Sequence, residues 1–424
     1  MTSFLFILYL FLFLWFIRRS HWLRQIGLTP VRLIGLYLLK VAAGIAYGYF
    51  FTRLPNYTQN ADTWRMFFAG VAEKQWLLQD PTAWLADVYT PRYAADTGLL
   101  GTENSLLNDV KDVVLIKLIS LLNLLTNDSY NSNLLFYNYA VFMGQAALAL
   151  CWKNVLQQKN AAWLLILIVC WPSTLFWCSG FHRDGLILLG LGVFAWKAWQ
   201  ETQHPKLTNK IWMLIAIALV FFLRNYVAVF AVLAAICFWL WAKWPAKRWL
   251  MLLAFVAGFT AFAVLSGNAI PQAIAQRQQA FAQLQGGSQM AALVLDGSWW
   301  SLLSQWPSAM LRGVLTPPLN LRWAWNDLPF AVENIVYVLA VLGAFFFIVK
   351  RKVVAFSQPQ QSWFIAALVI ALPILMLIGY TIPFATAIVR YKSILWPMLL
   401  PPVMYIIVQY LKHRWPNSRW LAFL

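Results

Sequence analysis

Four short polar segments interrupt the long apolar stretches of this 424-residue chain. Together they hold two carboxylates, an imidazole and several guanidinium and ammonium groups. A carboxylate can take the proton of an attacking hydroxyl, and fixed cations can hold a phosphate and neutralise the charge on a departing one. This set of groups predicts transfer of a group such as a sugar from a phosphate-linked donor to a hydroxyl. The segments are Asn60–Arg65, Ser179–Gly185, Leu223–Tyr226 and Ile388–Lys392.

The two carboxylates are the candidate catalytic residues. Asp62, in Asn-Ala-Asp-Thr-Trp-Arg, is the candidate general base, and Asp184, in His-Arg-Asp-Gly, is the second candidate. Each also has a simpler interpretation. Asp62 suits the N-cap of a helix, and Asp184 suits an ion pair or turn with Arg183. The residue types alone leave both interpretations open.

The basic and aromatic residues of the same segments are candidate ligands for the phosphate. Arginine suits bidentate contact with a phosphate, and lysine supplies a point charge. The alternative for an arginine at the end of a span is anchoring at the membrane interface. The alternative for His182 is a structural role in its turn, without contact to a substrate. No Asp-X-Asp or His cluster demands a metal, so no metal ligand or cofactor is assigned, and a divalent metal stays open. The candidates are Arg65, His182, Arg183, Arg224, Arg390, Tyr391 and Lys392.

The composition is that of a helical membrane protein. Hydrophobic residues make up 62% of the chain and charged residues 11%, against about 25% in an ordinary soluble domain. This excludes a soluble or disordered chain, because too little charge is present to cover a surface. The apolar runs suit helices across a bilayer core of ~30 Å and are too unbroken for barrel strands. About eleven spans are predicted, at residues 3–17, 31–52, 132–150, 161–178, 185–199, 211–223, 226–242, 249–266, 334–349, 362–380 and 393–411.

The loops between these spans alternate in charge. One set holds 17 of the 32 basic residues and a single acidic residue, whereas the other holds 13 residues of each sign. Basic residues collect in cytoplasmic loops, so we expect the N-terminus outside and the C-terminus inside, in the inner membrane of a bacterium. The net charge of +18 then reports orientation and contact with anionic membrane lipids, and no nucleic-acid partner is expected.

Two long segments, 53–131 and 267–333, belong to the external set. The first carries nine of the fourteen acidic residues and an amphipathic stretch over 106–125. The second combines a Gln-rich helical stretch with a Trp-rich one, which is typical of helices in the membrane interface. With 1–30 as an additional span and cytoplasmic loop, residues 1–424 are predicted to form a single all-α membrane domain.

The order and sidedness of these motifs resemble the GT-C superfamily of integral-membrane glycosyltransferases. Asp62 stands shortly after a span in the first long external loop, as an acidic residue does in that superfamily. Trp171–Gly185 resembles a turn of its bacterial polysaccharide-assembly members, and Arg390-Tyr391-Lys392 resembles their Arg-Tyr motif before a Pro-rich span. The resemblance implies a polyprenyl-phosphate-linked sugar donor, an inverting transfer outside the membrane, and a lipid, glycan or protein acceptor. This chain departs from the pattern in having its long loop after the second span and no acidic neighbour beside Asp62.

Other functions use the same residues differently. A polysaccharide polymerase or ligase acting on lipid-linked oligosaccharide would use arginine as its main catalytic group and no carboxylate base. A flippase for lipid-linked sugar would need a polar path through the spans, yet apart from Arg32 at the edge of 31–52 the spans hold only two charges, Lys40 and Lys197. A structural membrane subunit is the remaining alternative.

Overall fold

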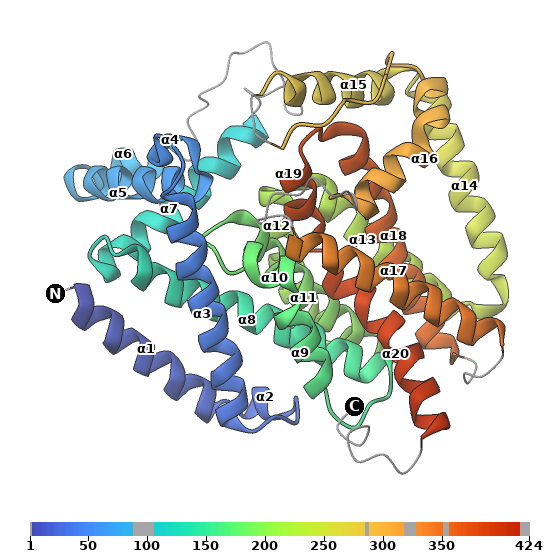
Figure 1. The fold of residues 1–424 in the computed structure, drawn as a ribbon, viewed down its shortest axis with the longest axis horizontal. Coiled ribbons are helices and arrows are strands. Elements are labelled where there is room, and N and C mark those ends of the chain that lie inside the picture. The colour runs from blue at the N-terminus through green and yellow to red at the C-terminus, as the bar shows by residue number, and fades with distance from the viewer. Residues whose placement is uncertain (1, 88–105, 285–287, 318–327, 351–355, 416–424) are drawn as a thin grey trace.

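The computed structural model consists almost entirely of helices, which agrees with the predicted all-α class (Figure 1). Within the described part, β pairing is limited to one isolated bridge between Gln289 and Phe384. The described residues are 2–87, 106–284, 288–317, 328–350 and 356–415. In chain order the helices are α1 (Thr2–Arg19), α2 (His21–Arg24), α3 (Pro30–Phe51), α4 (Tyr57–Asn60), α5 (Asp62–Gln79), α6 (Pro81–Ala86), α7 (Leu106–Thr126), α8 (Tyr130–Val155), α9 (Ala162–Cys170), α10 (Pro172–Trp177), α11 (Arg183–Gln203), α12 (Leu207–Leu223), α13 (Asn225–Lys243), α14 (Arg248–Leu265), α15 (Ala269–Ala282), α16 (Trp299–Leu315), α17 (Leu328–Val349), α18 (Gln358–Thr381), α19 (Ala385–Lys392) and α20 (Trp396–Arg414).

Six of the described helices are long and apolar enough to cross a membrane: α1, α3, α8, α13, α17 and α18. The pair α19 and α20, bent by 69°, adds a seventh if it counts as one broken span. The prediction of about eleven spans is therefore wrong. The expected span 161–178 is divided before Pro172, which cannot continue helix α9. Helix α12 has only 17 residues, and α11 carries charges in its first turn.

Helix α8 lies at the centre of the bundle, with α1, α3 and α11 packed around it. Its backbone touches that of α11, because Gly144 and Gly192 carry no side chains. A Cβ atom on Gly192 would lie 2.0 Å from the carbonyl oxygen of Gly144. Small residues permit this close approach between helices in membranes. The contact fixes α11, whose first turn carries candidate site residues.

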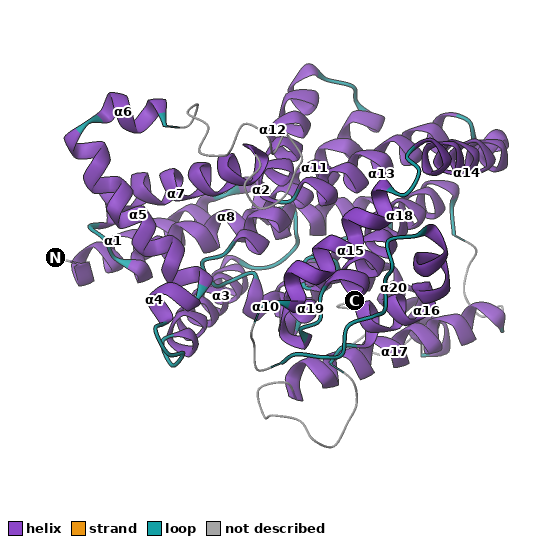
Figure 2. Ribbon diagram, turned by 90° about the horizontal axis from the view of Figure 1, so that it is seen from above, coloured by secondary structure: helices purple, strands orange, loops and turns teal. Residues whose placement is uncertain are grey.

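The second half of the chain forms a layer around α18. Helices α13 and α16 pack along α18, and α15 crosses the upper end of this layer in Figure 1. Helix α14 stands at the periphery, as the view from above also shows (Figure 2). These helices surround the cavity described below.

The two long segments predicted to be external are largely helical where they are described, apart from stretches such as 288–298. The amphipathic stretch forms α7, which packs on α5, and the buried Lys117 joins them with Glu73 at 2.9 Å and Asp87 at 3.2 Å. The Gln-rich stretch forms α15, and the Trp-rich stretch forms α16, on which Trp300 and Trp306 are exposed. Residues 88–105 and Trp323 lie outside the described residues. Placement of these helices in the membrane interface stays a prediction.

Loops that the charge pattern assigned to one side lie together. The ammonium of Lys153 donates to the Gln25 carbonyl at 3.0 Å, and the Ala161 amide donates to the Ile26 carbonyl at 2.7 Å. This contact lies at the Pro30 end of α3, whereas α4 and α5 lie at its other end (Figure 1). At ~1.5 Å per residue, the 22 residues of α3 separate the two ends by about 33 Å. The structure thus separates these two basic loops from the segment that follows α3, and their assignment to cytoplasm or exterior stays a prediction.

Candidate active site

Asp62 is the first residue of α5, where the amide groups of the first turn favour a negative charge. The N-cap position belongs to Ala61, whose side chain makes no capping bond, so the N-cap interpretation of Asp62 is wrong. One turn along the helix, Arg65 Nη2 lies 3.3 Å from Asp62 Oδ1. The other oxygen, Oδ2, faces the centre of the protein.

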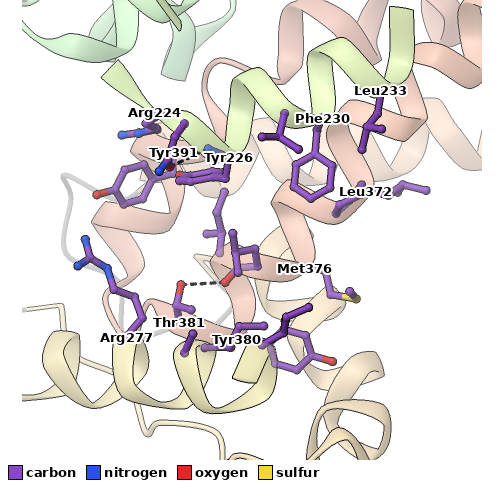
Figure 3. Close-up of a pocket in the computed structure, with 18 of the residues that line it drawn as sticks. Arg224, Tyr226, Phe230, Leu233, Arg277, Leu372, Met376, Tyr380, Thr381 and Tyr391 are labelled. Atoms are coloured by element: carbon purple, nitrogen blue, oxygen red, sulfur yellow. Dashed lines mark hydrogen bonds between the residues drawn. The ribbon is translucent and has the colours of Figure 1, made fainter. Parts of the chain in front are cut away.

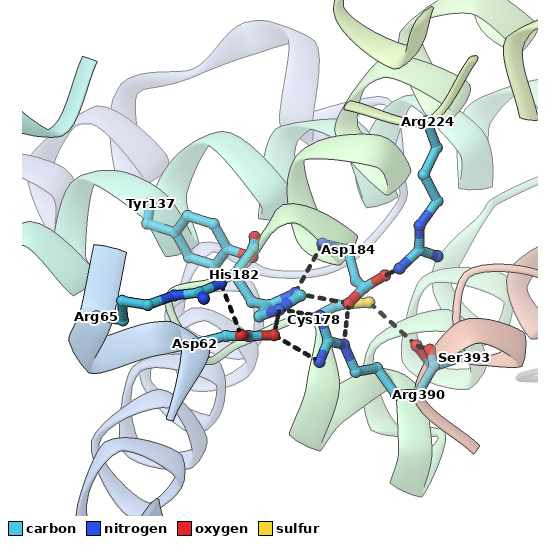
Figure 4. Close-up of polar contacts among 9 residues, drawn as sticks. All are labelled: Asp62, Arg65, Tyr137, Cys178, His182, Asp184, Arg224, Arg390 and Ser393. Carbon is cyan, nitrogen blue, oxygen red and sulfur yellow. Dashed lines mark hydrogen bonds and ion pairs between the residues drawn. The ribbon is translucent and has the colours of Figure 1, made fainter. Parts of the chain in front are cut away.

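The turn before α11 brings a second carboxylate toward Asp62. His182 is the N-cap residue of α11, and its Nδ1 lies 2.6 Å from Asp184 Oδ2. Its Nε2 lies 3.3 Å from Asp62 Oδ2, so the imidazole stands between the two carboxylates (Figure 4). A hydrogen bond from α8 also stabilises the turn, because the hydroxyl of Tyr137 donates to the His182 carbonyl at 2.6 Å.

Arg390, on α19, ties the two carboxylates together. Its Nη1 lies 2.9 Å from Asp62 Oδ2, and its Nε lies 3.0 Å from Asp184 Oδ2. Its Nη2 contacts the imidazole of His182. One guanidinium therefore joins two carboxylates from distant parts of the chain, and Asp62 lies 328 positions from Arg390 (Figure 4). Only helix packing produces this arrangement.

Arg224 pairs with Asp184 from the opposite side. It lies between α12 and α13, and its Nη2 is 2.7 Å from Asp184 Oδ1. Its guanidinium carbon lies 3.8 Å from the ring centre of Tyr391, within the range of a cation–π contact. The side chain is only 10% exposed, and its Nη1 is buried with no hydrogen-bond partner in the described structure. An unpaired buried donor of this kind is costly, which makes Nη1 a candidate for binding a ligand oxygen.

The two carboxylates differ in access. The Asp184 side chain is 0% exposed, and Arg224, Arg390 and His182 surround it. In this conformation it is enclosed by these three side chains and contacts all of them, and its predicted catalytic role stays a prediction. The Asp62 side chain is 37% exposed. Burial alone would raise its pKa, but the hydrogen bond with His182 and the charges of Arg390 and Arg65 hold the pKa of this carboxyl well below its usual range.

A cavity of about 1740 Å³ opens beside this cluster. Its polar end is lined by Arg183, Arg224, Arg277 and Arg390, and none of the described residues that line it is acidic. The remainder is apolar and is formed by α13, α15, α16 and α18, with Phe230, Leu233, Leu372 and Met376 along one wall (Figure 3). Helices α15 and α16, from the second segment predicted to be external, thus form part of the cavity wall. The combination suits an amphiphile with an anionic head and a long apolar tail.

Lys392 does not join this cluster. Its ammonium is buried and donates to the carbonyls of Val314, at 3.1 Å, and Thr316, and to Asn334 Oδ1 at 2.7 Å. All three of its N–H groups are therefore used, and its predicted role as a phosphate ligand is wrong for this conformation. Arg65 and Tyr391 do lie at the cluster, through Asp62 and Arg224 respectively.

Two contributing residues were missed in the sequence. Arg277 lines the cavity from α15, and its signal was its position as the single charge within the Gln-rich stretch. Lys40, noted only as a charge within a span, is buried and donates to the Cys178 carbonyl at 3.2 Å and to Ser179 Oγ at 3.0 Å. It therefore supports the turn that carries His182 and Asp184. The sequence feature that could have identified Lys40 is its charge inside an apolar helix, since such a charge is costly unless it has a role.

No known protein family matches the chain, and comparisons with curated proteins and with solved structures likewise found no match. Within the described ranges, no three His, Cys, Asp or Glu side chains are grouped so as to hold a metal ion. The functional argument therefore depends on the geometry of this site.

Proposed function

We propose that this protein is a membrane glycosyltransferase that moves a sugar from a polyprenyl-phosphate-linked donor to a lipid, glycan or protein acceptor. The observation that carries the proposal is the cavity with an arginine-lined end and an apolar body. A polyprenyl chain fits the apolar walls, and the phosphate fits the cationic end, where Arg224 Nη1 has no other partner. This placement puts the sugar next to Arg390.

The proposed reaction has two sides separated by Arg390. The donor phosphate lies in the cavity with Arg224, and the acceptor approaches the exposed side of Asp62. The acceptor oxygen attacks the anomeric carbon, and its proton passes to the Asp62 carboxylate. The bond from that carbon to the phosphate oxygen breaks, and its electron pair stays on the phosphate. The arginines neutralise the added negative charge.

Asp62 must be released from its ion pairs to act as a base. In the described conformation its pKa is held low by His182, Arg390 and Arg65, which makes it a weak proton acceptor. A phosphate placed near Arg390 competes for the same guanidinium, because both ligands are anionic oxygens. Donor binding would then weaken the pair between Asp62 and Arg390 and raise the basicity of the carboxylate.

The proposal includes the GT-C-like character of the enzyme, its inverting stereochemistry and its place in a bacterial inner membrane. We assign the N-terminus to the exterior and the C-terminus to the cytoplasm, on the basis of the charges of the loops. The site then lies at the outer face, since Asp62 lies at the end of α3 away from the basic loops. Sugar transfer to a cell-envelope polymer or lipid would take place there.

The test is the Asp62→Asn variant, assayed with lipid-linked sugar in detergent or liposomes. Loss of a general base lowers transfer by roughly 10²–10⁴-fold, and donor binding should remain because Asp62 does not line the cavity. Asp80→Asn is the matched control, since Asp80 is an exposed carboxylate in the same external segment and Asn also serves as an N-cap. Movement of lipid-linked sugar across liposomes without any transfer would contradict the enzyme proposal.

A second candidate function is favoured by the ion pairs of Asp62. A polymerase or ligase for lipid-linked oligosaccharide that uses arginine in place of a carboxylate base would tolerate the low pKa of Asp62. Full transfer by the Asp62→Asn variant, with loss of transfer on replacement of Arg224, would select this second function.

A further inference from the structure

The cationic end of the cavity includes a guanidinium on α15 that the proposed reaction leaves unused. Arg277 lies on α15 and lines the cavity. Its guanidinium carbon lies 5.0 Å from the ring centre of Phe281, and it has no carboxylate partner among the described residues. A cation that lines a largely apolar cavity without a counter-ion favours an anion there.

Arg277 and Arg224 face the same end of the cavity from different helices. Tyr226, at the start of α13, lines the same end of the cavity. Figure 3 shows both side chains at the end where Tyr391 and Tyr226 lie, away from Phe230 and Leu233. The two cations are therefore placed to share one extended anionic head group.

The net charge of the site exceeds what one phosphate diester requires. Asp62 and Asp184 offset two of the three arginines Arg65, Arg224 and Arg390, which leaves one positive charge. Arg277 adds a second positive charge to this set, and Arg183 also lines this end of the cavity. A monophosphate diester carries one negative charge, whereas a diphosphate diester carries two and gains a third when the sugar leaves.

Hydrogen bonds fix the position of the helix that carries Arg277 relative to the rest of the cavity wall. The neighbouring Gln278 is buried and its Nε2 donates to the Tyr380 carbonyl at 2.8 Å. After α15, the Met290 amide donates to the Pro383 carbonyl at 2.7 Å, and the Ala385 amide donates to the Ser288 carbonyl at 3.0 Å. Arg277 is thus fixed relative to α19, which carries Arg390. A site held on rigid elements can discriminate between head groups of different length.

We infer that the lipid donor of the proposed reaction carries a diphosphate, with Arg224 on the phosphate next to the sugar and Arg277 on the phosphate next to the lipid. This inference rests on the proposed function for the identity of the donor. The bond that breaks still joins the anomeric carbon to a phosphate oxygen, so the leaving group is a lipid diphosphate that keeps the electron pair.

The test measures binding of farnesyl monophosphate and farnesyl diphosphate to the purified full-length protein by isothermal titration. We expect the wild type to bind the diphosphate at least tenfold more tightly, since a hydrogen bond to a charged group contributes about tenfold or more. Arg277→Gln should reduce this ratio to about threefold or less while leaving the affinity for the monophosphate unchanged. Gln276→Ala is the matched control, because Gln276 is exposed on the same helix and does not line the cavity.

A wild-type protein without preference for the diphosphate would overturn the inference, as would an Arg277→Gln variant with the wild-type ratio. A thermal melt confirms that the variant is folded, and Arg277→Lys should restore part of the ratio by restoring the charge. The assay needs no sugar transfer. A failure here, with transfer still abolished in Asp62→Asn, would reject the diphosphate and leave the proposed enzyme function standing.

Discussion

Replacement of Arg224 separates the structural and functional roles of the arginine cluster. The Asp184 side chain is fully buried, and Arg224 is one of its two guanidinium partners, at 2.7 Å. Removing one partner of a buried pair costs about 3–5 kcal/mol. Asp184 keeps Arg390 at 3.0 Å and His182 at 2.6 Å. We therefore expect Arg224→Ala to lower the free energy of unfolding by less, about 2–3 kcal/mol.

The effect of Arg224→Ala on transfer should be larger than its effect on folding. The variant removes the buried Nη1 that we assign to the phosphate. Loss of one preorganised donor to a developing oxyanion lowers the rate by about 10²–10³-fold. Arg224→Lys keeps a charge but cannot place one donor on Asp184 and another on a phosphate in the geometry of a guanidinium. It should recover most of the stability and little of the activity.

The structural part of this prediction is checked by a double-mutant cycle, in which the stability of each variant in detergent is measured by thermal denaturation. If Arg224→Ala destabilises because Asp184 is left with too little counter-charge, adding Asp184→Asn should recover part of the loss. A double variant that melts no higher than Arg224→Ala alone would refute the reasoning, because Asp184 would then not be the group that needs Arg224. Transfer by both single variants is measured on the same preparations.

The remaining predictions concern the effect of pH on stability and the role of the buried Lys392. Because the folded-state pKa of Asp62 is depressed, its contribution to stability should be fully present above its unfolded pKa of about 4 and be lost as the pH falls through the folded value. The difference in melting temperature between wild type and Asp62→Asn should accordingly be constant from pH 7 to 5 and shrink below pH 4; an unchanged difference at pH 3 would contradict the pairing. Lys392→Met should destabilise the protein by about 3–5 kcal/mol, because it strips a buried cation from Asn334 Oδ1 and from the neighbourhood of Glu333. Adding Glu333→Gln should recover part of that loss in a thermal melt, and no recovery would show that the two groups are independent.

Much of the class of this protein could be predicted from its composition. A chain with 62% hydrophobic and 11% charged residues cannot cover a soluble surface, so long apolar helices were the expected result. The number of spans could not be obtained in the same way. Hydropathy does not distinguish an apolar helix that faces lipid from one enclosed by other helices, and α9, α11 and α12 are too short or too charged to cross on their own.

The candidate site could be predicted in part because charge is costly in a membrane. Few ionisable residues occur near the spans, so Asp62, Asp184, Arg224 and Arg390 stood out, and the structure brings all four together. The error at Lys392 arose because helix α19 was not among the predicted spans. Residues two apart on a helix do not share a face, so Arg390 and Lys392 on α19 had to point in different directions.

The sequence by itself determined the helices, the polar segments between them and the scarcity of charge that marks those segments. Only the tertiary structure decided which carboxylate is exposed and which is enclosed, since Asp62 and Asp184 differ little in local sequence character. It also decided that Arg277 lines the same cavity as Arg224, because these residues lie on helices whose packing no local pattern encodes. Helix positions follow from local hydrogen bonding and hydropathy, whereas a shared site depends on contacts between residues hundreds of positions apart. The pair between Arg390 and Asp62 is one of these contacts.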